Sequence, residues 1–86
     1  HAGIKPKVAL EDQKPQDLRW IRESFLKHKK PHPAIIVHGH TIVESAENLK
    51  NRIAVDTGAY KSGVLTCVKL HEKSQTFIST SPDLAS

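Results

Sequence analysis

The chain has 86 residues, a formal net charge of +4, and only one tryptophan, one tyrosine and two phenylalanines. This length allows one domain with a modest core, and no apolar run is long enough to span a membrane. The positive charge comes from scattered lysines without interleaved aromatic residues or a known binding module, which argues against a nucleic-acid partner. The single cysteine, Cys67, excludes an internal disulfide and is typical of a protein of the reducing cytoplasm.

The first residues resemble the middle of a longer sequence more than a natural N-terminus. The chain begins at His1, with a histidine in place of an initiating methionine. We therefore expect residues 1–86 to be the C-terminal part of a single larger domain, with the remainder of the same polypeptide upstream. A glycine and a proline interrupt residues 1–14, which predicts an irregular segment with one helical turn at 10–13.

A single amphipathic helix is predicted over residues 15–28. Pro15 suits the first helical position, and Asp17 places negative charge in the first turn, where the helix dipole favours it. Apolar side chains recur every three to four residues, as on one face of a helix; they are Leu18, Ile21, Phe25 and Leu26. Basic residues follow, and Pro31 ends the helix.

Four short strands are predicted after the helix, from runs of apolar and β-branched residues bounded by turn signals. We expect these strands at residues 34–38, 52–56, 64–70 and 75–80. The last two should form a hairpin. The connecting segments are predicted to be a loop at 42–51, turns at 60–63 and 71–74, and a loose tail at 81–86.

These elements predict an α/β fold. The runs 34–38 and 52–56 have little polar alternation, which is typical of strands covered on both faces of a sheet. One helix is too little to provide that cover. We therefore expect half of a layered domain, in which further polypeptide covers the sheet.

His38 and His40 flank Gly39 directly after the first predicted strand. Ligands of α/β proteins bind at the carboxyl ends of strands, and residues two apart in an extended segment point to the same side. Neutral imidazole binds zinc, iron and manganese. Because a metal site needs three or four ligands, a pair of hydrogen-bonded histidines at a strand end remains the alternative.

Three other histidines and Asp56 are expected to have structural or surface roles and not to bind a ligand. We expect His28, His32 and His71 to be solvated surface residues, since they lie beside lysines and prolines. Asp56 closes a strand and is expected to cap the turn that follows it. The sequence contains no glycine-rich phosphate loop, Cys-x-x-Cys motif or nucleophile elbow.

Arg22 and Tyr60 each allow two interpretations. Arg22 either pairs with a carboxylate on the surface or grips phosphate, for which the guanidinium fork is well shaped. Tyr60 follows a strand in a loop, and it either anchors that loop or faces a substrate. Composition does not decide between these roles.

Four segments occur in the order typical of one enzyme family. They are residues 1–4 (His-Ala-Gly-Ile), 17–22 (Asp-Leu-Arg-Trp-Ile-Arg), 37–41 (Val-His-Gly-His-Thr) and 52–60 (Arg-Ile-Ala-Val-Asp-Thr-Gly-Ala-Tyr). Together they resemble calcineurin-like metallophosphoesterases, and most closely the bacterial-type serine/threonine protein phosphatases, from position 1 to about position 70. The resemblance implies the C-terminal half of a layered metallophosphoesterase β-sandwich flanked by helices, with one main helix and about four strands in this chain.

The resemblance also implies roles for individual residues. His1 and His40 would be the imidazole ligands of one metal in a centre of two divalent ions, which are manganese, iron or zinc. The other ligands and the general acid would belong to upstream motifs, so no catalytic residue is assigned. Arg22 and Tyr60 are similar to residues near the substrate phosphate, and His38 has no ligand role in the family.

The implied activity is that of a metal-dependent phosphoester hydrolase, a protein serine/threonine phosphatase in which a hydroxide held by two metals attacks phosphorus in line. Its substrate would be a phosphorylated protein or a small phosphoester. Two alternatives stay open: symmetrical hydrolysis of diadenosine polyphosphates on the same scaffold, and a non-catalytic binding module of the same fold. Since it offers two ligands at most, the 86-residue chain alone is expected to be inactive.

Overall fold

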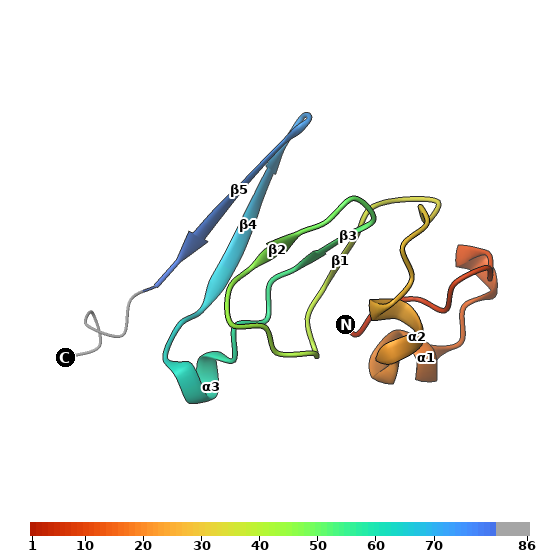
Figure 1. The fold of residues 1–86 in the computed structure, drawn as a ribbon, viewed down its shortest axis with the longest axis horizontal. Coiled ribbons are helices and arrows are strands. Elements are labelled where there is room, and N and C mark those ends of the chain that lie inside the picture. Colours follow the sequence, from red (N-terminus) through yellow and green to blue (C-terminus); the bar gives the residue numbers. More distant parts are fainter. Residues whose placement is uncertain (81–86) are drawn as a thin grey trace.

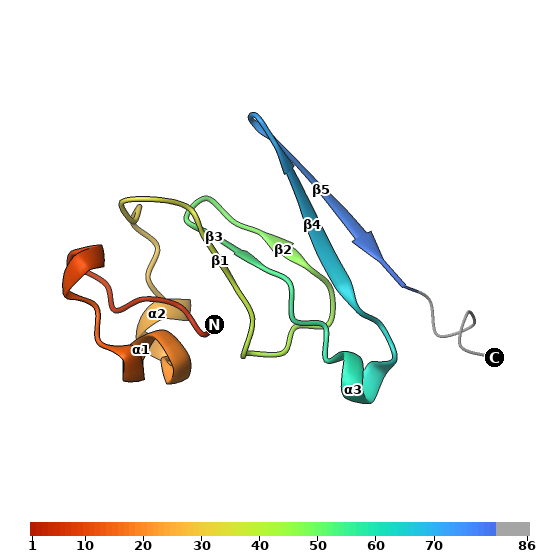
Figure 2. The same ribbon diagram turned by 180° about the vertical axis from the view of Figure 1, so that it is seen from behind.

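The computed structural model describes residues 1–80 and shows a mixed α/β arrangement. Two short helices lie at one end, a three-stranded sheet lies in the middle, and a β-hairpin projects at the other end (Figure 1). The same order is visible from behind (Figure 2). The predicted tail at 81–86 lies outside the described residues. Within residues 1–80, no helix has the length and apolar character that crossing a membrane requires.

The N-terminal segment is irregular, as predicted, apart from one 3-10 turn, η1 (Leu10–Asp12). The side chain of Gln13 closes this segment. Its Oε1 accepts a hydrogen bond from Lys5 N–H (2.8 Å), and its Nε2 donates to the carbonyl oxygens of Lys5 and Val8, both at 2.9 Å. These bonds bring the end of the segment back to Lys5.

The single long helix predicted from the sequence is wrong. The structure has two short helices, α1 (Pro15–Trp20) and α2 (Glu23–Leu26). The break falls at Ile21 (φ −59°, ψ 144°) and Arg22 (φ −131°, ψ −98°), neither of which is helical. Phe25 follows the break, in α2, and its ring is completely buried. Burial of a large aromatic ring outweighs the few helical hydrogen bonds lost at the break.

The central sheet has the strand order β1-β3-β2, with β1 at Ile36–His38, β3 at Arg52–Ala54 and β2 at Glu47–Asn48. β1 runs parallel to β3, and β2 runs antiparallel to it. The two predicted apolar strands are confirmed, although each is shorter than predicted. β2 lies in the stretch predicted to be a loop. The sequence did not reveal this strand because its polar side chains show no periodic pattern, and it is formed by backbone pairing with β3.

The predicted hairpin is confirmed as β4 (Thr66–His71) and β5 (Ser74–Ser79), which pair in continuous antiparallel register. The turn predicted at 60–63 is a short helix, α3 (Ala59–Ser62), between the sheet and the hairpin. Gly58 (φ 69°) and Gly63 (φ 74°) bound it in left-handed conformations that glycine adopts without a steric penalty.

The core is small and centres on Phe25, whose side chain is 0% exposed. A methyl group placed on Gly3 would lie 2.4 Å from Cδ2 of this ring, so the backbone of Gly3 packs directly against it. His32 stacks on the ring with centroids 5.6 Å apart, and His38 meets it edge-on at 4.8 Å. The other buried apolar residues among residues 1–80 are Ala2, Ile4, Ile53 and Ala54. The prediction that His32 is a solvated surface residue is therefore wrong.

The expected cover on both faces of the sheet is found for only one of the two apolar strands. All three residues of β3 are buried. In β1, Val37 is 43% exposed, and the preceding Ile35 is also exposed. Within residues 1–80, the apolar face of β1 is thus left open.

We expect His32 to make the chain less stable as the pH falls. Burial, and secondly the nearby His28, lower the pKa of His32 from its ordinary value of 6.5. A group with a lower pKa in the folded state binds fewer protons when folded, so its contribution to stability is present above about pH 6.5 and is lost below it. His32→Phe should keep the stacking on Phe25 and lose less stability between about pH 7.5 and about pH 5 than the wild type, as measured by urea denaturation.

His71→Phe is the matched control for this measurement, because His71 is exposed on the hairpin and the prediction that it is a surface residue is confirmed. It should retain the wild-type dependence of stability on pH. Identical dependence in the wild type and both variants would contradict the role assigned to His32.

Candidate metal centre

The structure brings the rings of His1 and His40 together. Their centroids are 5.0 Å apart, with an edge-to-face angle of 63°. Two backbone hydrogen bonds place the first residues between α1 and the end of β1: Ala2 N–H donates to the carbonyl oxygen of Leu18 (2.7 Å), and Gly39 N–H donates to that of His1 (2.8 Å). The N-terminus accordingly lies beside the end of β1 in both views (Figures 1 and 2).

His40 occupies a strained turn. Thr41 N–H donates to the carbonyl oxygen of Gly39 at 2.7 Å, and the φ of His40 is 66°. This combination matches the rarer and more strained form of the γ-turn. The backbone is therefore not extended through His40, so the argument that places His38 and His40 on the same side does not apply, and the two rings face different surroundings. Strained residues of this kind persist where the surrounding structure fixes them, and they concentrate at functional sites.

The ring of His40 carries a buried nitrogen without a partner. Its Nε2 atom is buried and forms no hydrogen bond within residues 1–80. A buried polar atom left in this state costs about 1–3 kcal/mol, and such atoms in native proteins call for a ligand, an ion or a water. Nε2 of His40 is therefore the atom in this turn best suited to bind a cation.

Trp20 contacts the ring of His40, and sequence reasoning missed it. Its ring meets that of His40 edge-on with centroids 5.7 Å apart, although Trp20 is 67% exposed. The only sequence signal was its place in the resembling segment 17–22. The contact joins α1 to the turn after β1, and such a tertiary contact is not predicted by helical spacing.

The two predicted substrate residues have different surroundings. Nη1 of Arg22 donates to Oγ1 of Thr41 at 3.3 Å, which brings the guanidinium next to the turn at His40. Tyr60 lies on α3 and is 86% exposed. Within the described chain, no hydrogen bond or ring contact links Tyr60 to the histidine pair. The structure therefore groups His1, His40 and Arg22, and it leaves Tyr60 apart.

Asp56 caps its own turn, as predicted: Gly58 N–H donates to its Oδ1 at 3.0 Å. The carboxylate also lies beside Gly39, since a methyl group there would be 3.7 Å from Oδ2. Sequence reasoning gave Asp56 this capping role and did not place it next to the histidine turn. The parallel pairing of β1 and β3 explains the proximity, because both strands end at the same edge.

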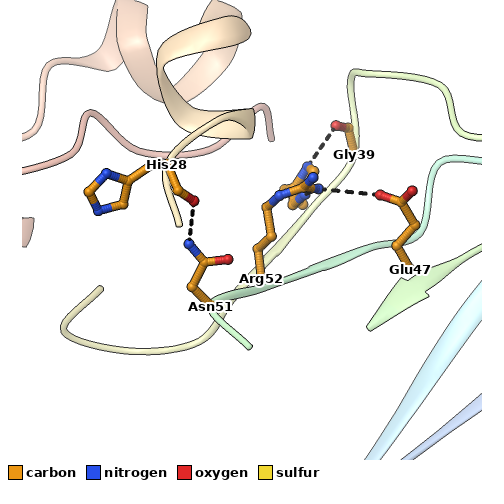
Figure 3. Close-up of polar contacts among 6 residues, drawn as sticks. His28, Gly39, Glu47, Asn51 and Arg52 are labelled. Atoms are coloured by element: carbon orange, nitrogen blue, oxygen red, sulfur yellow. Dashed lines mark hydrogen bonds and ion pairs between the residues drawn. The ribbon is translucent and has the colours of Figure 1, made fainter. Parts of the chain in front are cut away.

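His38 belongs to a separate buried network, whose members Gly39, Glu47 and Arg52 are labelled in Figure 3. It is 3% exposed, and its Nε2 lies 3.0 Å from Nη1 of Arg52. Arg52 also lies 3.6 Å from Oε1 of Glu47, and Figure 3 shows this ion pair. Burial lowers the pKa of His38, and the charge of Arg52 lowers it further, while the hydrogen bond with the carbonyl of Gly39 raises it. Burial and the neighbouring guanidinium thus both favour the neutral form of His38.

Asn51 connects the start of β3 to the segment after α2 through side-chain hydrogen bonds. Its Nδ2 donates to the carbonyl oxygens of His28 (2.7 Å) and Lys30 (3.1 Å), and the first bond is drawn in Figure 3. Asn51 and its neighbour Arg52 are both buried. Together they tie β3 to the helical end of the molecule and to β1.

The histidine pair fits part of a metal site. Two imidazoles bound to one ion by bonds of about 2.0–2.1 Å would have ring centroids roughly 5 Å apart, which agrees with the 5.0 Å between His1 and His40. No group of three or more His, Cys, Asp or Glu side chains within residues 1–80 could hold a metal ion. The pair therefore offers two of the three or four ligands that such a site needs.

Comparisons with known proteins add no family assignment. No family model matches the chain, and neither a curated protein nor a solved structure matches it. The candidate centre is accordingly defined by the positions of His1, His40 and Arg22.

Proposed function

We propose that His1 and His40 are two ligands of a divalent-metal centre in a phosphoester hydrolase, a serine/threonine protein phosphatase of the calcineurin-like type. The observation that carries the proposal is the meeting of the two imidazoles, together with the buried and unpartnered Nε2 of His40. Imidazole nitrogen suits zinc, iron and manganese. A cation at this position would give that nitrogen the partner it lacks.

The surrounding residues suit a phosphoester substrate. Arg22 has its guanidinium beside the turn that carries His40, and this planar group binds phosphate oxygens through paired hydrogen bonds. When bound, divalent ions in such a centre supply an activated water and neutralise charge on the phosphoryl group. In this proposal His1 and His40 hold a cation, and Arg22 orients the phosphate.

A complete centre of this kind needs more ligands than the pair supplies. We propose that the remaining ligands come from polypeptide other than residues 1–80, and that this polypeptide also covers the open apolar face of β1. The exposed side chains of Ile35 and Val37 support this, because apolar residues in a strand are stabilised by removal from water.

Zinc binding by the 86-residue chain tests the metal half of the proposal. We expect isothermal titration to show one zinc ion bound, with affinity reduced by at least about tenfold in His40→Asn and in His1→Ala, because each removes one of two ligands. Asparagine tolerates the positive φ at position 40. His71→Asn, on the exposed hairpin, is the matched control and should bind zinc as the wild type does.

Acetylation of the N-terminus separates the imidazole of His1 from the free amine, which is itself a metal ligand. The acetylated chain should bind zinc with unchanged affinity. If His40→Asn and His71→Asn bind zinc equally well, or if acetylation alone removes binding, the metal centre at His1 and His40 does not exist.

Inorganic phosphate tests the substrate half. We expect the zinc-loaded chain to bind phosphate, and Arg22→Met to weaken that binding by about tenfold, as the loss of a hydrogen bond to a charged group implies. Arg19→Met is the matched control, because Arg19 is an exposed arginine of α1 whose side chain, among residues 1–80, bonds only within its own helix (Pro15 carbonyl, 3.3 Å). Equal phosphate affinity in the two variants would contradict the assignment of Arg22.

A further inference from the structure

We infer that Arg52 and His38 are positioning residues, which hold the strained turn of His40 in the conformation that faces His1. A chain of contacts carries the inference. Arg52 bonds the Nε2 of His38, the Nδ1 of His38 bonds the carbonyl oxygen of Gly39, and that oxygen closes the turn around His40. Holding His40 in place serves a purpose only if the metal centre exists, so this inference rests on the proposed function.

The first contact fixes where the proton of His38 lies. Arginine has donors and no acceptor, so the Nε2 atom that it approaches at 3.0 Å must be the unprotonated acceptor. The neutral ring then carries its proton on Nδ1. This proton lies 3.2 Å from the carbonyl oxygen of Gly39, measured between heavy atoms, and it is donated there. Arg52 therefore selects the tautomer that makes the second bond possible.

The second contact supports a strained part of the backbone. The carbonyl oxygen of Gly39 accepts both Nδ1–H of His38 (3.2 Å) and the amide N–H of Thr41 (2.7 Å). The Thr41 bond closes the turn in which His40 has a φ of 66°. A conformation of this type costs about 1–3 kcal/mol and persists only when its surroundings determine it strongly. Two bonds to Gly39, one from Nδ1–H of His38 to its carbonyl oxygen and one from its N–H to the carbonyl oxygen of His1, hold the residue before His40 in place.

Besides its contact with His38, Arg52 is held by two further residues, Glu47 and Phe25. Glu47 lies 3.6 Å from Nη1, and the guanidinium carbon lies 6.0 Å from the ring centroid of Phe25. The ring of His38 is held edge-on against the same phenyl group, with centroids 4.8 Å apart. The donor and the imidazole are thus packed against one rigid aromatic residue, so their mutual geometry has little freedom.

Nuclear magnetic resonance of the metal-free chain tests the first contact. Two-bond correlation of the ring nitrogens and protons should identify His38 as the tautomer protonated on Nδ1, and Arg52→Met should shift the population measurably toward the other tautomer. Arg19→Met should leave it unchanged. A ring of His38 protonated on Nε2 in the wild type would overturn the inference.

Amide hydrogen exchange tests the effect on the turn. Without zinc, Arg52→Met should raise the exchange rate of the Thr41 amide by about tenfold, which corresponds to the loss of about 1.4 kcal/mol. The Ile36 amide, which donates to Asn51 in the sheet (3.3 Å), should exchange as before. Arg52→Lys keeps a charged donor and should restore most of the protection at Thr41.

The outcomes distinguish positioning from general support of the fold. If the amides of Thr41 and Ile36 lose protection equally, Arg52 only stabilises the sheet, and the inference is wrong. It is also wrong if neither amide responds. These measurements contain no metal, so they are independent of the zinc titration. A response at Thr41 alone supports the positioning role, and a failure to bind zinc then contradicts only the proposed function.

Discussion

Replacement of Gly3 by alanine should unfold most of the chain at room temperature. The new methyl group would lie 2.4 Å from Cδ2 and 2.6 Å from Cε2 of Phe25, and the backbone of Gly3 has a φ of 149° that other residues rarely adopt. Overpacking of a core costs about 1–3 kcal/mol, and the unfavourable backbone conformation adds about 1–3 kcal/mol. A domain of this size has only about 5 kcal/mol of stability in all.

The measurement is urea denaturation followed by circular dichroism, with Gly39→Ala as the matched control. A methyl group on Gly39 would meet nothing closer than 3.6 Å, and its φ lies outside the left-handed region. We expect Gly39→Ala to change the free energy of unfolding by less than about 1 kcal/mol. Equal stability of the two variants would show that Gly3 does not pack on Phe25 as described.

Truncation of Phe25 to alanine should lower the free energy of unfolding by about 3–5 kcal/mol, the usual range for a buried phenylalanine. Its ring is fully buried and contacts Gly3, His32 and His38, so its removal leaves a cavity at the centre of the core. Phe77→Ala, on the partly exposed strand β5, is the control and should cost less. Similar losses at the two positions would place the core elsewhere.

The two substitutions should also interact strongly. Since the methyl group of Gly3→Ala clashes with the ring of Phe25, it should destabilise the Phe25→Ala background much less than the wild type, as a double-mutant cycle would reveal. Trimethylamine N-oxide in all samples would keep the less stable variants folded enough to measure. Additive effects of the two substitutions would contradict direct packing between them.

The sequence predicted the elements whose signals are local. The β-branched run before His38 and the alternating residues of the hairpin identified β1, β4 and β5, because side-chain alternation in a strand is visible in the sequence. The cap formed by Asp56 was predictable for the same reason, since it joins residues two apart. The resemblance to metallophosphoesterases singled out His1 and His40, and their role as ligands stays a prediction.

Only the tertiary structure decided where the helix breaks and which polar groups are buried. The break at Ile21 and Arg22 precedes Phe25, whose ring is buried against Gly3, a contact between residues far apart in the chain. The contact of Arg52 with His38 likewise appears only when β1 and β3 pair. The spacing of apolar residues in the sequence indicates which face of an element is apolar. The assembled fold determines which residues pack against that face, and therefore also the charge and hydrogen bonding of each buried side chain.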